Sequence, residues 1–323
     1  MSIKWNDSVR LIISDVDDTL AETYAPASKE LTIELTKLLS EGKALFLISG
    51  QGITNIQNRI VNQIDKEFRK QVIVGICSGA EVWGFSEDGQ LLNKPFYSLY
   101  EKTFCDTHKS AWRVVVKDVL QKFGFTVLNT MPKPKFREVS KGDPMTIMYE
   151  DRGPQITFEL VNSCFLTEEQ HRAIKLKLPF IGDNKDLRVS VIEYASKFLV
   201  EKGIPVTARL AGNFAIDFAI ENVTKTTAVK YVMECRECLA HIGLDSEAVS
   251  KAENIEVWGD KYSVVNGGTD RHISEALPKD VRSIDFRKEK LEELPEGYNI
   301  VIWDGTMELC EGVLEYLKNR NNN

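Results

Sequence analysis

The sequence lacks any long hydrophobic run. No apolar stretch reaches the ~18 residues that a membrane-spanning helix needs, and the start of the chain has no basic segment followed by an apolar one, so we expect no secretory signal. Positive charge is also scarce, with 41 Lys and Arg against 48 Asp and Glu and a net charge of −7. These absences argue against a membrane protein, and against a nucleic-acid-binding protein that depends on attraction to phosphate.

Cysteine is sparse as well. Six cysteines in 323 residues indicate reduced thiols and predict a cytoplasmic protein. Cys235, Cys238 and His241 form a Cys-x-x-Cys-x-x-His sequence, which is compatible with a metal or redox site. Apolar residues at helical spacing around it favour an ordinary helix instead, and no second cysteine pair completes a four-ligand zinc site.

Length and composition are those of a globular protein. Hydrophobic residues make up 43% and charged residues 28% of the chain, as in soluble domains. A chain of 323 residues is long enough for a large core and for two domains. The pattern predicts no particular oligomeric state.

A buried strand that ends in acids is the central feature of the sequence. Residues 9–13 are mostly consecutive Val, Leu and Ile, as in a parallel strand covered on both faces. Three carboxylates follow within four positions, at Asp15, Asp17 and Asp18. Two like charges ~4 Å apart repel by ~4 kcal/mol at an effective dielectric constant of ~20. A Mg²⁺ ion would turn that repulsion into ligation, at the strand end where open α/β sheets bind ligands.

Polar residues end the next apolar strand too. Residues 44–48 predict a second buried strand, followed by Ser49, Gly50, Gln51 and Gly52. A hydroxyl group beside glycines is suited to a turn whose backbone N–H groups bind phosphate. An ordinary strand-to-helix turn accounts for the same residues.

Three further residues follow later strands. Lys225 falls in the first turn of a predicted helix, where its charge opposes the helix dipole, so a phosphate group nearby would compensate it. Asp260 ends a strand predicted at residues 255–258, and Asp270 comes ten residues later. This spacing makes Asp270 a less certain metal ligand than Asp260.

These four segments together resemble the four motifs of the haloacid dehalogenase (HAD) superfamily of phosphotransferases. The resemblance implies a Rossmann-like α/β core, a parallel sheet flanked by helices. It implies that Asp15 is the nucleophile, that Asp17 is the general acid and base, and that Ser49, Gly50 and Lys225 bind phosphate. It also implies Mg²⁺ held by Asp15, Asp17 through its carbonyl, Asp260 and Asp270, and a small phosphate ester as substrate, most simply a sugar phosphate.

The spacing of the motifs predicts an inserted domain. Only 34 positions separate Asp15 from Ser49, but 176 separate Ser49 from Lys225. We therefore expect a catalytic core at residues 1–83 and 210–323 and an α+β cap at residues 84–209, which selects the substrate in the related phosphatases. Within the cap we expect a helix over residues 107–123 and strands at 188–194 and 197–200.

Other functions are compatible with the same core. A phosphomannomutase-like enzyme would need basic cap residues for a second phosphate, and Arg113, Lys135, Arg137 and Arg152 are candidates. The arginine-bearing cap segment of the mutases is not recognisable, which favours a phosphatase. A receiver-like signalling module is ~120 residues and has no internal cap. A non-catalytic phospho-ligand-binding protein is disfavoured by the complete set of motif residues.

Overall fold

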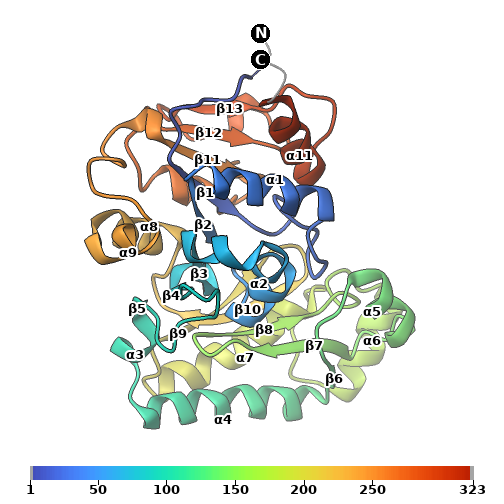
Figure 1. The fold of residues 1–323 in the computed structure, drawn as a ribbon. Coiled ribbons are helices and arrows are strands. Elements are labelled where there is room, and N and C mark those ends of the chain that lie inside the picture. The colour runs from blue at the N-terminus through green and yellow to red at the C-terminus, as the bar shows by residue number, and fades with distance from the viewer. Residues whose placement is uncertain (1–2, 321–323) are drawn as a thin grey trace. The chain divides into compact units, whose positions relative to one another are not determined.

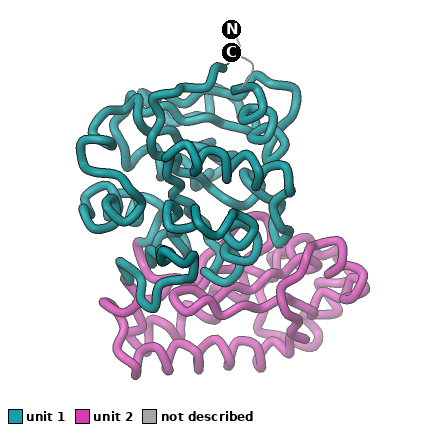
Figure 2. Tube along the Cα trace, viewed as in Figure 1, with its two compact units in different colours: residues 1–98, 223–323 teal, residues 99–222 magenta. Residues whose placement is uncertain are grey.

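A computed structural model describes residues 3–320 of the chain. The chain forms two compact units (Figure 2). The first contains residues 1–98 and 223–323, and the second contains residues 99–222. Of the helices in the described part of the chain, none combines the length and apolar character needed to cross a membrane.

The first unit is built on an eight-stranded sheet in the order β13-β12-β11-β1-β2-β3-β4-β5 (Figure 1). The five pairs from β13 to β3 are parallel, and β4 and β5 are added antiparallel. The strands are β1 Leu11–Asp15, β2 Ala44–Ile48, β3 Val72–Ile76, β4 Glu81–Gly84, β5 Tyr97–Ser98, β11 Ile255–Gly259, β12 Arg282–Asp285 and β13 Ile300–Ile302. The helices are α1 Lys29–Ser40, α2 Ile53–Arg59, α8 Lys225–Glu234, α9 Arg236–His241, α10 Arg271–Ser274 and α11 Leu309–Asn319.

The central strands are buried on both faces, which explains their continuous apolar sequences. One face packs against α8 and α9 in a cluster that includes Leu11, Ile13, Phe46, Val229 and Leu239. Helices α1 and α11 contact each other, and α1 contacts β2 (Figure 1). The predicted parallel sheet flanked by helices is confirmed.

Helix α1 follows from local sequence signals. The Ser28 side chain accepts a hydrogen bond from the Leu31 backbone N–H at 3.2 Å, so that it caps the first turn. Leu31, Leu35 and Leu38 recur on one face and are buried, and Gly42 adopts a positive φ of 80° just beyond the helix.

The second unit is an α+β module with a five-stranded sheet in the order β6-β7-β8-β10-β9. Only the β6–β7 pair is parallel. Its strands are β6 Thr126–Leu128, β7 Thr146–Asp151, β8 Gln155–Glu159, β9 Val206–Ala211 and β10 Ala215–Ile220. Its helices are α3 Leu99–Thr103, α4 Asp106–Phe123, α5 Lys133–Ser140, α6 Glu168–Lys177 and α7 Leu187–Glu201.

The strands expected at residues 188–194 and 197–200 are wrong, because both segments lie in the single helix α7. Val and Ile made this segment resemble a strand. Asp186 caps the helix by accepting a hydrogen bond from the Arg188 backbone N–H at 3.0 Å. The helix packs against β9, β10 and α4, so tertiary packing outweighs the intrinsic preference.

The boundaries between the units differ from the expected ones at residues 84 and 210. Strand β5 pairs with β4, which keeps the chain in the first sheet as far as Ser98. Strand β10 pairs with β8 and β9, which places it in the second sheet. The expected boundary at residue 210 assigns β10 to the catalytic core, and this assignment is wrong, because β10 lies in the second unit.

Candidate active site

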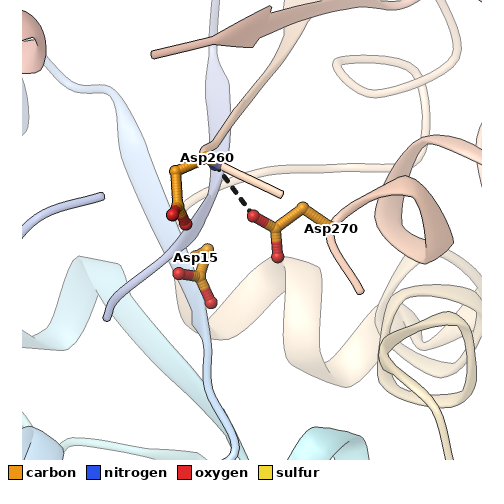
Figure 3. A group of neighbouring side chains, drawn as sticks. All are labelled: Asp15, Asp260 and Asp270. Carbon is orange, nitrogen blue, oxygen red and sulfur yellow. Dashed lines mark hydrogen bonds between the residues drawn. The ribbon is translucent and has the colours of Figure 1, made fainter. Parts of the chain in front are cut away.

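Three carboxylates meet at the carboxyl ends of two neighbouring strands. Strands β1 and β11 are paired in parallel, with Ser14 opposite Trp258, so Asp15 and Asp260 emerge at the same edge of the sheet. Asp270 approaches them from the loop before α10 (Figure 3). Ligand oxygens of the three carboxylates all lie within 4.8 Å of one another. The exposed fractions of Asp15, Asp260 and Asp270 are 6%, 0% and 1%.

Lys225 provides a positive charge between Asp15 and Asp270. It is the first residue of α8 and is 4% exposed. Its Nζ donates to Asp15 Oδ1 and, at 2.7 Å, to Asp270 Oδ1. The structure therefore brings the predicted lysine together with the predicted nucleophile, although 210 positions separate them in sequence.

Asp270 occupies a defined position in spite of the long spacing that made it uncertain. Its Oδ2 accepts the backbone N–H groups of Asp260 and Lys261, both at 2.9 Å. Its Oδ1 accepts from Lys225. The ten-residue spacing thus forms a loop that returns to the strand end, and the second acid hydrogen-bonds the backbone that carries the first.

The crowding of these acids changes their titration. Burial, together with the charge of Asp270, raises the pKa of Asp15 to about 8, and Lys225 only partly offsets this. Burial and Asp270 likewise raise the pKa of Asp260 to about 6. Burial opposes ionisation of Asp270 as well, but the Lys225 ammonium holds its pKa below the ordinary value. A divalent cation among these oxygens would favour the ionised carboxylates.

Asp17 lies outside this carboxylate cluster. Its Oδ1 accepts from Arg59 Nη1 at 2.7 Å and its Oδ2 from Ser49 Oγ at 2.8 Å. The Arg59 side chain is 6% exposed and also donates to the carbonyl oxygens of Ala25 and Glu22. Arg59 therefore holds both the Asp17 carboxylate and the loop after β1.

The turn after β2 is shaped by Ser49. Its hydroxyl donates to Asp17 and accepts the Gln51 backbone N–H at 3.0 Å. Gly50 has no positive φ, and an added Cβ would meet Ser78 Oγ at an ordinary 3.7 Å. The conformation of this turn does not itself require glycine at position 50.

Several contacting residues were not predicted as site residues. Arg287 donates through Nε to Asp260 Oδ2 at 2.9 Å, and Lys261 Nζ lies 3.4 Å from the same oxygen. Thr19 Oγ1 donates to Asp260 Oδ1 at 3.1 Å. Thr19 and Lys261 could have been found, because they lie inside the recognised motifs. Arg287 and Arg59 carried no signal, because neither lies in a motif.

The Cys-x-x-Cys-x-x-His sequence does not form a metal centre. His241 Nε2 lies 2.9 Å from the Phe85 carbonyl oxygen, consistent with a hydrogen bond. Within residues 3–320, the single group of three or more His, Cys, Asp or Glu side chains with converging ligand atoms is Asp15, Asp260 and Asp270.

The fold and this carboxylate cluster define an α/β protein with an acidic site at the strand ends. No protein-family model matches the sequence, and no curated protein matches it either. Solved structures do share its fold. One is the C-terminal domain of trehalose-6-phosphate phosphatase from C. albicans, with 14% identity, coverage of 98% of this chain and 93% of that one, and a TM-score of 0.56.

A haloacid dehalogenase-like hydrolase from Bacteroides thetaiotaomicron is also similar, with 13% identity, coverage of 96% and 99%, and a TM-score of 0.53. A trehalose-6-phosphate phosphatase related protein aligns at 13% identity over 95% of each chain, with a TM-score of 0.50. At these identities the likeness is one of fold. One of these structures is described as a haloacid dehalogenase-like hydrolase, and the sequence motifs resemble those of the same superfamily.

Proposed function

We propose that this protein is a Mg²⁺-dependent phosphatase that hydrolyses a small phosphate monoester through an aspartyl-phosphate intermediate. The observation that carries the proposal is the buried cluster of Asp15, Asp260 and Asp270 beside Lys225, at the carboxyl end of the central strand. Perturbed ionisable groups at such a position are typical of catalytic sites. The shared HAD-type fold supports the same conclusion.

The donor set fits a magnesium ion. Hard divalent cations prefer carboxylate and carbonyl oxygens, and three buried carboxylates supply oxygens within 4.8 Å of one another. Asp15, Asp260 and Asp270 would hold the ion, with the Asp17 carbonyl as a further donor. When bound, the ion shields the negative charges of nucleophile and phosphate from each other.

The chain's own groups then have distinct roles. An oxygen of Asp15 attacks phosphorus, the bond to the leaving oxygen breaks, and Asp17 donates a proton to that oxygen. Asp17 then removes a proton from the water that hydrolyses the aspartyl-phosphate, which releases inorganic phosphate. Lys225, Ser49 and the backbone at Gly50 bind the phosphoryl oxygens. Arg59 orients Asp17, and Thr19 orients Asp260.

A sugar phosphate is the substrate class that we propose. Two of the structures that share the fold are a trehalose-6-phosphate phosphatase domain and a protein related to that enzyme. In this proposal the second unit, residues 99–222, acts as the cap that selects the substrate and excludes bulk water.

Two of the four candidate basic residues of the second unit, Arg113 and Arg152, favour hydrolysis over a mutase reaction. Arg113 forms a bidentate ion pair with Asp151, through Nη2 at 2.8 Å and Nε at 3.0 Å. Arg152 pairs with Glu150 at 2.8 Å. These arginines already have carboxylate partners inside their own unit, which does not suggest a site for a second phosphate.

The test is phosphate release from hexose phosphates, trehalose 6-phosphate and sucrose 6-phosphate, with and without Mg²⁺. We expect release that stops with EDTA and with Asp15→Asn, whose folding is checked by circular dichroism. Interconversion of hexose 1- and 6-phosphates without release would indicate a mutase instead. Absence of both reactions, in a folded protein with Mg²⁺, would refute an enzyme acting on these esters.

A further inference from the structure

Cys235 and Cys238 lie at the junction between α8 and α9, apart from the carboxylate cluster in sequence. Cys235 follows the last residue of α8 and caps α9, and Cys238 is the third residue of α9. The Cys235 sulfur accepts the Cys238 backbone N–H at 3.3 Å. The Cys235 sulfur thus lies against the backbone of Cys238, three positions further along the chain.

The two thiols differ in accessibility. Cys235 is partly exposed, whereas Cys238 is fully buried. Burial opposes ionisation of Cys235, but its hydrogen bonds with Cys238 and the backbone lower its pKa overall. Burial raises the pKa of Cys238 far above the ordinary value. Because thiolates are the reactive form, Cys235 is the thiol that reacts with a solute, and Cys238 is placed to resolve the product.

The surroundings of this pair favour redox chemistry over metal binding. A metal would need a third and fourth ligand, and His241, the nearest candidate in sequence, is directed at the Phe85 carbonyl instead. The Cys235 thiol also lies 3.6 Å from the Tyr231 hydroxyl oxygen, and that hydroxyl donates to the Phe96 carbonyl at 2.8 Å. Loss of the thiol proton leaves the Tyr231–Phe96 hydrogen bond intact, because Cys235 is the donor in its contact with Tyr231.

We propose that Cys235 and Cys238 form a reversible intrachain disulfide. The Cys235 thiolate attacks one sulfur of a low-molecular-weight disulfide such as oxidised glutathione, and one glutathione thiolate leaves. The Cys238 thiolate then attacks the Cys235 sulfur of the mixed disulfide and releases the second glutathione. Two protein thiols thus lose two protons and two electrons, and one glutathione disulfide is reduced to two glutathione molecules.

This disulfide would act as a reversible modification and would not stabilise the fold. It closes a loop of only four residues, and short loops constrain the unfolded chain least. A disulfide of this kind is formed and reduced with little change in fold stability. This site is independent of the proposed phosphatase reaction.

The test is thiol trapping in the full-length protein. The protein is equilibrated in buffers of reduced and oxidised glutathione, quenched in acid, alkylated with N-ethylmaleimide and analysed as peptides by mass spectrometry. We expect the peptide that carries both cysteines to lose two hydrogen atoms and both alkylation sites together, and to recover them with dithiothreitol. In the reduced protein, Cys235 should be alkylated at least ~10-fold faster than Cys238.

Variants identify the partners. Cys235→Ser and Cys238→Ser should each abolish the two-hydrogen loss, and Cys310→Ser, which removes another partly exposed cysteine, should leave it unchanged. Full alkylation of both wild-type thiols at every glutathione ratio would overturn the proposal. A glutathione adduct on Cys235 that never resolves would overturn it too. The wild-type measurement is sufficient even if a variant folds poorly.

Discussion

Replacing Lys225 by methionine removes the charge that balances two buried acids. Lys225 Nζ contacts Asp15 and, at 2.7 Å, Asp270. Methionine keeps much of the side-chain length and adds no new charge. At pH 8 without divalent metal, the variant must bury these carboxylates with no cation between them.

The magnitude follows from the geometry. One ion pair at 2.7 Å amounts to a gross ~6 kcal/mol at an effective dielectric constant of ~20. Removing one partner of a buried pair costs about 3–5 kcal/mol after relaxation. Part of this is recovered by protonation, because the pKa of Asp15 is already raised to about 8. We expect Lys225→Met to lose about 3–5 kcal/mol of unfolding free energy at pH 8, and clearly less at pH 5.

The assay is urea denaturation of wild type and variant at pH 5 and pH 8, each with EDTA. Lys261→Met is the matched control, because its Nζ lies 3.4 Å from Asp260 but its side chain is 42% exposed. Such an exposed pair should contribute less than ~1 kcal/mol. Mg²⁺ at ~100 times its Kd should raise the unfolding free energy of Lys225→Met by about 2.7 kcal/mol.

One result would refute this reasoning. If Lys225→Met and Lys261→Met both match the wild-type unfolding free energy at pH 8 with EDTA, Lys225 does not balance buried charge. A loss that is equal at pH 5 and pH 8 would show instead that lost packing, and not ionised carboxylate, accounts for the effect.

Three more predictions concern the first unit. Without divalent metal, the melting temperature should fall as pH rises from about 4 to about 8, because the folded-state pKa values of Asp15 (about 8) and Asp260 (about 6) exceed the unfolded value of 3.8. Mg²⁺ should reduce this dependence on pH. A series of melting curves with EDTA that shows no such fall would contradict the prediction. Arg59→Met should lower kcat by about 10²–10⁴-fold by releasing Asp17, and a kcat within twofold of wild type would exclude this positioning role. Arg282→Met should lower the unfolding free energy measured by urea denaturation by about 3–5 kcal/mol, because it leaves the fully buried Glu256 carboxylate without its cation. A double variant with Glu256→Gln should recover part of this loss.

The strands that carry the candidate site could be predicted from sequence because they are buried on both faces. Such strands consist of consecutive apolar residues, and each ends where polar residues begin. Asp15, Ser49 and Asp260 were therefore placed at strand ends without a structure. Helix α1 was equally predictable, because the Ser28 cap and the leucine spacing are local signals.

Tertiary contacts decided what local pattern left open. The strand preference of Val and Ile in residues 187–201 was outweighed by the packing of α7 against β9, β10 and α4. Strand β10 falls in the segment expected to belong to the core, yet its pairing with β8 and β9 places it in the second sheet. Alternation of side chains specifies that a strand forms, but its neighbours depend on distant segments.

The sequence by itself predicted the fold class from apolar strands with polar ends, and its resemblance to the HAD motifs singled out the acids and the lysine of the carboxylate cluster. Only the tertiary structure decided which charges meet. It joined Lys225 to Asp15 across 210 positions, brought Asp270 back to the backbone of Asp260, and directed Arg59 to Asp17. The physical reason is the separation in sequence over which each interaction acts. Periodicity and capping act within a few residues, whereas ion pairs form between whatever side chains the packed core brings within a few ångströms.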